Sequence, residues 1–198
     1  MAAKKKKTPN NKKPGKNQWA DHLTQRAKNE NYPARSVYKL EEIQNKFQVL
    51  KKKDMVLDLG CAPGSWLLYA AKKVGNQGKV FGIDLKQIQI LLPENVVAIE
   101  DNILNMDNGS VFDEKTRFNT ILSDMAPATT GRKDVDALRS FDLCNMALKV
   151  ADDFLLKNGN FVCKIFQGND FNAFQKNVKS KFKDCKIFKP ESCRKQSK

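Results

Sequence analysis

Short runs of aliphatic and β-branched residues recur along the middle of the chain, and helical patterns or loops separate them. The runs lack the alternation of apolar and polar residues that a sheet with one solvated face would show. Between them, apolar side chains recur every three or four residues, which predicts helices. The predicted strands are 55–60, 79–85, 95–101, 118–124, 160–166 and 185–188, and the predicted helices are 18–30, 34–48, 64–74, 134–157 and 170–181. This order predicts an α/β fold, in which helices cover both faces of a mostly parallel sheet.

Four of the predicted strands end in an aspartate or are followed directly by one: Asp58, Asp84, Asp101 and Asp124. A single aspartate at such a place more often caps a helix or forms a turn. Ligands of doubly wound sheets bind beyond the carboxyl ends of the strands, where these side chains would meet. Four acids in succession therefore favour a shared cofactor crevice.

The segment DLGCAPGSW begins at Asp58, and its glycines Gly60 and Gly64 would let the backbone approach a ligand as the chain turns into a helix. It is neither a GxGxxG nor a Walker motif, so a dinucleotide phosphate is the weaker interpretation, and a turn without any ligand is the alternative. Asp84 could accept the ribose hydroxyls of a nucleoside, and Asp101 would lie near the adenine edge. Trp66 is either ordinary core packing or a wall of the pocket.

A lysine within an apolar strand is the second unusual feature. Lys164, in VCKIF, would be costly to bury unless its ammonium were paired or neutral. It could reach solvent along its own stem. Alternatively, it lies beside Asp124 with its pKa tuned for proton transfer.

Charge is concentrated at the two ends of the chain. The formal net charge is +14, with seven lysines and no acid in residues 1–17, and nine basic against two acidic residues in 172–198. Basic ends on a neutral body suggest a polyanionic partner, although a solubilising tail is an equal alternative. We expect residues 1–17 to be a disordered basic tail and 18–198 to be one domain.

The five cysteines form no CxxC pair, so neither a disulfide framework nor a metal site is indicated. The longest apolar runs are strand-sized and no signal peptide precedes them. We expect a cytoplasmic protein with no membrane segment.

Several segments resemble the FtsJ (RrmJ) family of ribosomal RNA 2′-O-methyltransferases over about residues 18–198. They are SVYKLEEIQ (36–44), DLGCAPGSW (58–66), GIDL (82–85), SDMAP (123–127), VCKIFQG (162–168) and KPES.R (189–194). The resemblance implies a Rossmann-like fold, S-adenosylmethionine as the cofactor, and methyl transfer to a ribose 2′-hydroxyl, of uridine, in large-subunit ribosomal RNA or the assembled large subunit. Two alternatives remain: a tRNA 2′-O-methyltransferase, and an RNA-binding ribosome-assembly factor with impaired catalysis. We expect a monomer.

The resemblance also implies roles for individual residues. Cofactor contacts carry over to Gly64, Trp66, Asp84, Asp101 and Asp124, and catalytic roles to Lys39, Asp124 and Lys164. The family's fourth catalytic residue, an acid that follows the KPES.R segment, has no counterpart here, and Glu191 does not take its place. Because KPESCRKQSK (189–198) is polar and turn-like, we expect the closing strand to be missing. An open slot beside the fifth strand and a mobile end after Lys189 are the expected consequences.

Overall fold

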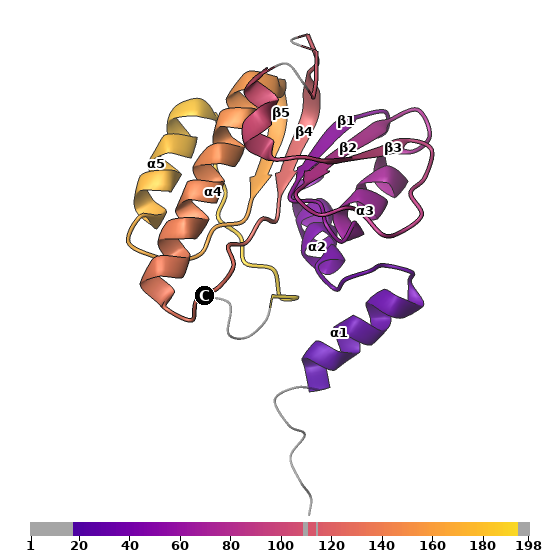
Figure 1. The fold of residues 1–198 in the computed structure, drawn as a ribbon, viewed down its shortest axis with the longest axis horizontal. Coiled ribbons are helices and arrows are strands. Elements are labelled where there is room, and N and C mark those ends of the chain that lie inside the picture. The colour runs from indigo at the N-terminus through magenta and orange to yellow at the C-terminus, as the bar shows by residue number, and fades with distance from the viewer. Residues whose placement is uncertain (1–17, 109–110, 114, 194–198) are drawn as a thin grey trace, which may run out of the picture.

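The described residues form one parallel sheet with helices packed on both of its faces (Figure 1). The computed structural model describes residues 18–108, 111–113 and 115–193. The strands are β1 (Met55–Leu59), β2 (Lys79–Asp84), β3 (Val96–Glu100), β4 (Phe118–Ser123) and β5 (Leu155–Cys163). The helices are α1 (Gln18–Asn29), α2 (Val37–Phe47), α3 (Ser65–Val74), α4 (Lys133–Phe154), α5 (Phe171–Lys181) and the short 3-10 helix η1 (Ile103–Asn108). The strand order is β3-β2-β1-β4-β5 and every pairing is parallel, which confirms the predicted fold class.

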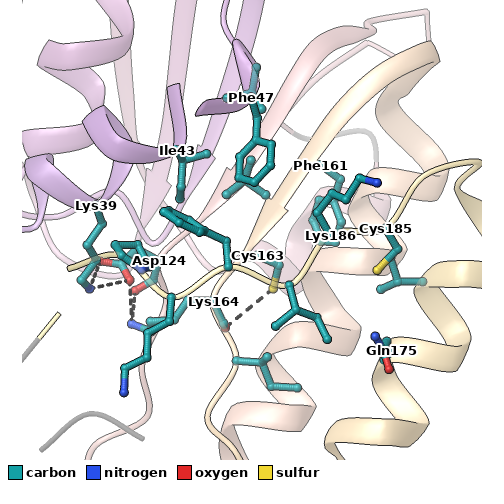
Figure 2. Close-up of a pocket in the computed structure, with 18 of the residues that line it drawn as sticks. Lys39, Ile43, Phe47, Asp124, Phe161, Cys163, Lys164, Gln175, Cys185 and Lys186 are labelled. Atoms are coloured by element: carbon teal, nitrogen blue, oxygen red, sulfur yellow. Dashed lines mark hydrogen bonds and ion pairs between the residues drawn. The ribbon is translucent and has the colours of Figure 1, made fainter. Parts of the chain in front are cut away.

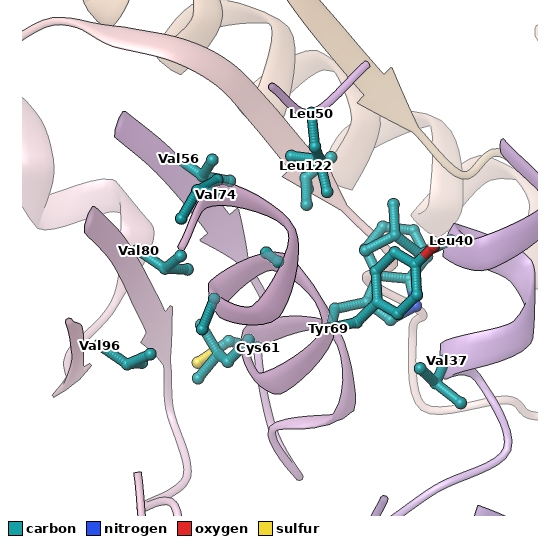
Figure 3. Packing of buried hydrophobic residues seen from close by; sticks show 14 of the residues in the cluster. Val37, Leu40, Leu50, Val56, Cys61, Tyr69, Val74, Val80, Val96 and Leu122 are labelled. Atoms are coloured by element: carbon teal, nitrogen blue, oxygen red, sulfur yellow. The ribbon is translucent and has the colours of Figure 1, made fainter. Parts of the chain in front are cut away.

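Alternation along the strands divides the core into two layers. In β1, Val56 joins a cluster with α2 and α3, which Figure 3 shows from close by. Its neighbours Leu57 and Leu59 point the other way and pack with α4 residues such as Ala147. Both layers consist of buried aliphatic and aromatic side chains, so the strands that carry the aspartates are packed on both faces.

Helix α2 is joined to the sheet layer through α3, and α1 lies at the outer end of the fold (Figure 1), where its Leu23 and Ala27 are buried in the same cluster as α2 and α3. The indole Nε1 of Trp66 donates to the carbonyl of Ser36 at 2.8 Å. The Ser65 hydroxyl accepts from the amide of Ala34 and donates to its carbonyl. These bonds fix the entrance of α2 against the beginning of α3, and they therefore fix the position of Lys39 one turn later.

The boundary between α4 and β5 differs from its prediction. The helix ends at Phe154, and β5 begins at Leu155 rather than at residue 160. Leu155 pairs with Phe118, and a bulge around Asn158, whose φ is +64°, then resets the register. The asparagine and glycine of LLKNGN are typical of a turn, which is why the sequence did not predict a strand there. In the structure they form the bulge instead. Lys164 was predicted within a strand, but β5 ends one residue earlier, at Cys163. Cys163 is the last residue that pairs with β4, because β4 itself ends at its partner Ser123.

The last segment departs from prediction in two respects. Residues 185–188 were predicted as a sixth strand, but they pair with no strand, and the described part of the chain contains five. The end expected to be mobile after Lys189 forms a turn over 190–193, closed by a bond from the Cys193 amide to the Pro190 carbonyl, and residues 194–198 lie outside the described residues. In the described part of the chain β5 is an edge strand, and a cavity of about 610 Å³ lies beside it, which is consistent with the predicted open slot. The predicted disordered tail, 1–17, lies outside the described residues.

Candidate active site

The four aspartates meet at the carboxyl edge of the sheet, as their spacing predicts. Asp58 lies in β1, Asp84 ends β2, and Asp101 and Asp124 directly follow β3 and β4. The chain reverses its direction of winding between β1 and β4, which is where ligands of such sheets bind. Asp58 and Asp124 flank that point.

The two glycines of the first turn are required by its geometry. Gly60 and Gly64 have φ values of +74° and +105°, which L side chains rarely adopt. A Cβ atom on Gly60 would collide with the side chain of Met125, and one on Gly64 would lie 2.8 Å from Ile90. The space that side chains at Gly60 and Gly64 would need is taken by Met125 and Ile90. The two glycines thus allow the neighbouring loops to pack against the turn.

Asp58 is a buried carboxylate with one oxygen that has no partner among the described residues. It is 1% exposed, and its Oδ2 makes no hydrogen bond within the described part of the chain. Burial raises its pKa well above the ordinary range, and the charges of Asp124 and Asp84 raise it further. Such a group is stabilised by a ligand that brings a positive charge or a hydrogen-bond donor.

Asp84 and Asp101 are held by the backbone around them. Asp84 accepts bonds from the amides of Ala62 and Lys86, both at 2.9 Å. Asp101 accepts from the Asn102 amide at 2.6 Å and from the Asn105 side chain, whereas the amide of Leu104 inside η1 is accepted by the Asn102 side chain at 3.0 Å. Asp101 therefore holds the loop before η1, and the capping role expected of a lone strand-end aspartate falls to Asn102. Both carboxylates stay partly exposed at the sheet edge, where a ligand can reach them.

Trp66 combines the two roles that the sequence left open. It is 5% exposed and belongs to the core cluster of α2 and α3. It also lines a small cleft of about 40 Å³, together with Asp58, Gly60 and Asp124. That volume accepts one small polar group. A larger ligand must therefore extend from the cleft over the open edge at Asp84 and Asp101.

Lys39, Asp124 and Lys164 form one cluster from three distant parts of the sequence (Figure 2). The Lys39 ammonium lies 2.9 and 3.0 Å from the two carboxylate oxygens of Asp124. The Lys164 ammonium lies 2.9 Å from Asp124 Oδ1 and also donates to the Asp124 carbonyl. Burial lowers the pKa of Lys164, Asp124 opposes this effect, and the like charge of Lys39 lowers the pKa further. Lys164 is therefore held in place, and its pKa is lower than that of an ordinary lysine.

Helix α4 supports the backbone around Lys164, which the sequence did not predict. The Cys144 thiol donates to the Lys164 carbonyl at 3.1 Å, and the Ser140 hydroxyl accepts from the Phe166 amide at 3.0 Å. Both side chains are 1% exposed. Their spacing of four residues places them on one helix face, but a serine and a cysteine at that spacing are too common to indicate such a role.

The cavity beside β5 begins at this cluster. Lys39, Asp124 and Lys164 line it together with the apolar side chains of β5, α5 and α2. Residues 184–190 form its outer wall, and Figure 2 shows Cys185 and Lys186 from that wall. Substrate can thus approach the cluster from a side that the cofactor edge does not occupy.

Comparison with known proteins agrees with this arrangement. The family model described as FtsJ-like methyltransferase matches residues 32–198. The chain belongs to this family. The FtsJ-like chain is 59% identical over 186 residues to the ribosomal RNA large subunit methyltransferase E of Desulforapulum autotrophicum, covering 94% of the chain and 92% of that relative. The protein of the same name from Bdellovibrio bacteriovorus is 44% identical over 181 residues, which is 90% of the chain and 92% of the relative.

A solved structure supports the fold assignment of the FtsJ-like chain. The crystal structure described as a ribosomal RNA methyltransferase of Plasmodium falciparum has a TM-score of 0.71 at 29% identity and covers 81% of this chain and 93% of its own. The family and the Rossmann-like fold predicted from the sequence are therefore confirmed. No helix within the described ranges is long and apolar enough to cross a membrane.

Proposed function

We propose that the protein transfers a methyl group from S-adenosylmethionine to a ribose 2′-hydroxyl, of uridine, in large-subunit ribosomal RNA. The observation that carries the proposal is the Lys39–Asp124–Lys164 cluster next to the acidic sheet edge. The relatives named ribosomal RNA large subunit methyltransferase E support the choice of RNA. A tRNA substrate is less favoured because these relatives are named for ribosomal RNA. An assembly factor without catalysis is less favoured because the three residues to which the resemblance assigns catalysis, Lys39, Asp124 and Lys164, are in contact.

The acidic edge fits the cofactor. When bound, S-adenosylmethionine supplies a methyl group on a positively charged sulfur, together with an ammonium and a ribose. Asp124 provides negative charge beside the Gly60 turn, and a positively charged ligand in the cleft would favour the ionised form of Asp58, whose unpartnered Oδ2 would then accept a bond. Asp84 would accept the ribose hydroxyls, and Asp101 would contact the adenine edge. Gly60 and Trp66 line the cleft and would shape it, while Gly64, which faces Ile90, would act only through the turn that it allows.

The chain's own residues would then activate the substrate. A ribose hydroxyl is a weak nucleophile until its proton is leaving, so a neutral Lys164 would accept that proton as general base. Asp124 orients Lys164, and the charge of Lys39 favours the neutral form. Alignment of the oxygen by the same cluster would contribute further to the rate. The fourth acid of the family is not needed to hold the two lysines, because Asp124 contacts both.

A methyl-transfer assay tests the function. Purified protein and radiolabelled cofactor are incubated with bare large-subunit RNA, assembled large subunits and tRNA, and the label is then mapped to base or ribose. We expect a ribose 2′-O-methyl in large-subunit RNA, and no label with Lys164→Ala. Label on a base, or on tRNA alone, would refute the proposal. With ribosomal RNA as the substrate we expect the activity in the cytoplasm, and gel filtration would test the expected monomer.

A further inference from the structure

The turn Pro190–Cys193 is attached to helix α2 by two side chains that the proposed chemistry does not use. The Glu42 carboxylate accepts the amide of Glu191 at 2.7 Å through Oε2 and the amide of Ser192 at 2.9 Å through Oε1. From the other side, the Arg35 guanidinium donates to the Ser192 carbonyl at 2.9 Å. We call these three bonds the clasp. They join residues about 150 positions apart in the sequence.

The clasp gives order to a segment that lacks strand pairing. Residues 183–189 lie outside every helix and strand, so their own backbone does little to fix them. Phe188 packs edge-on against Phe47 with ring centroids 5.5 Å apart, and the Lys46 ammonium lies over the Phe188 ring. Ser192 is 4% exposed although the turn lies at the surface. All of these contacts are made to α2 or to the loop before it.

The segment that is held in this way carries positive charge next to the active cluster. Lys183, Lys186 and Lys189 recur every third residue and are exposed. Lys186 and Lys189 line the same cavity as Lys39 and Lys164. The acids of the segment, Asp184 and Glu191, are also exposed and reduce its net charge. The segment has no large excess of positive charge. Anion binding by its lysines therefore depends on where their ammonium groups are held.

We propose that Glu42, assisted by Arg35, is a positioning residue that holds Lys186 and Lys189 where they contact phosphates of the RNA strand beside the target ribose. This inference rests on the proposed function, because it takes RNA as the substrate. Helix α2 links the two sites, since Lys39 and Glu42 lie three residues apart on it. The helix thereby sets the distance between the ribose cluster and the phosphate contacts.

The loss of the Glu42 charge and the loss of the clasp should change RNA affinity in opposite directions. Glu42 is an anion near the proposed RNA path, so removing its charge alone would strengthen RNA binding. Loss of the clasp would weaken binding, because the lysines would no longer be held. Glu41 provides a matched control: it is the neighbouring acid on α2, and its carboxylate pairs with Arg26 at 3.5 Å rather than with the turn.

The experiment compares Glu42→Ala, Glu42→Gln and Glu41→Ala in the full chain. RNA affinity is measured by fluorescence anisotropy with a large-subunit RNA fragment over a salt series. For Glu42→Ala we expect the Kd to rise about three- to tenfold and the salt slope to fall by about 1 to 1.5, the loss of two single-strand phosphate contacts. Glu42→Gln keeps one acceptor oxygen and should lie between wild type and Glu42→Ala. Glu41→Ala should leave the Kd unchanged or lower it, and cofactor affinity should be unchanged in all three.

Amide hydrogen exchange provides a readout that needs no RNA. In Glu42→Ala the amides of Glu191 and Ser192 should exchange faster, while those of β1 should not change. Unchanged RNA affinity in Glu42→Ala would overturn the proposal, and so would an equal loss in Glu41→Ala. If Glu42→Ala does not fold, Glu42→Gln and the exchange data decide. A wild-type protein that binds RNA but does not methylate it would refute the proposed function and leave this test intact.

Discussion

Replacement of Asp58 by asparagine tests whether the pKa of this buried carboxyl group is raised, so that its ionisation destabilises the cofactor-free protein. Burial and the charges of Asp124 and Asp84 raise its pKa in the folded protein. Between the ordinary pKa of about 3.9 and this raised value, the folded state keeps a proton that the unfolded state has lost. The free energy of unfolding of the cofactor-free protein therefore falls as pH rises through that window.

The size of the effect follows from proton linkage. A single group of this kind lowers the unfolding free energy by up to about 1.4 kcal/mol per pH unit. An asparagine side chain cannot ionise, so Asp58→Asn lacks this slope, and its stability relative to wild type should grow with pH. For a domain of this size that corresponds to a Tm difference that widens by about 3–5 °C per pH unit. A positively charged cofactor would favour the ionised form of Asp58, which asparagine cannot adopt, so the variant should also bind cofactor roughly 10- to 100-fold more weakly.

Thermal melts of the cofactor-free protein from pH 5 to pH 8, with calorimetric titration of S-adenosylmethionine, measure both effects. Asp142→Asn is the control, since it removes the same charge from an exposed position on α4. A Tm difference between Asp58→Asn and wild type that stays constant over this range would show that Asp58 ionises normally. Equal cofactor affinity would remove Asp58 from the binding site.

Four further results are expected. Lys164→Ala should lower methyl transfer at least about 100-fold with cofactor affinity nearly unchanged, since a general base acts on the substrate; loss of both would indicate a structural lysine. Lys39→Met removes a charge that lowers the pKa of Lys164, so the rising limb of the kcat against pH profile should move to higher pH, and an unmoved limb would contradict the role of Lys39. Asp84→Ala should weaken cofactor binding by about 1–3 kcal/mol in calorimetry, and unchanged affinity would refute the ribose assignment. Deletion of residues 1–17 removes seven lysines and should flatten the salt dependence of RNA binding without changing the Tm, whereas an equal salt slope would leave the tail as a solubiliser.

The features that the sequence predicted well are local ones. The first four strands are short apolar runs whose ends are marked by an aspartate, and the structure has them within a residue or two of their predicted bounds. For Trp66 and Lys164, residue type and position left two alternatives each, and the structure shows a buried Trp66 and a Lys164 paired with Asp124. These signals survive because each depends on a few neighbouring residues and on the rule that parallel strands share a carboxyl edge.

The features that the sequence did not predict depend on distant partners. CKIF has the composition of a strand, but a strand also needs an edge to pair with, and residues 185–188 lie across the cavity instead. The polar turn after Lys189 looked mobile because its partner, Glu42, is about 150 residues away. The early start of β5 was hidden by the bulge at Asn158.

The wide sequence separation of the three side chains proposed for catalysis has a consequence for folding. Lys39 and Asp124 are 85 residues apart, and Asp124 and Lys164 are 40 apart. Contacts of such long range form late in folding, because the intervening chain must first be ordered. During synthesis, the acidic edge from Asp58 to Asp124 leaves the ribosome before Lys164 does. The Lys39–Asp124–Lys164 cluster is therefore complete only once β5 has paired with β4.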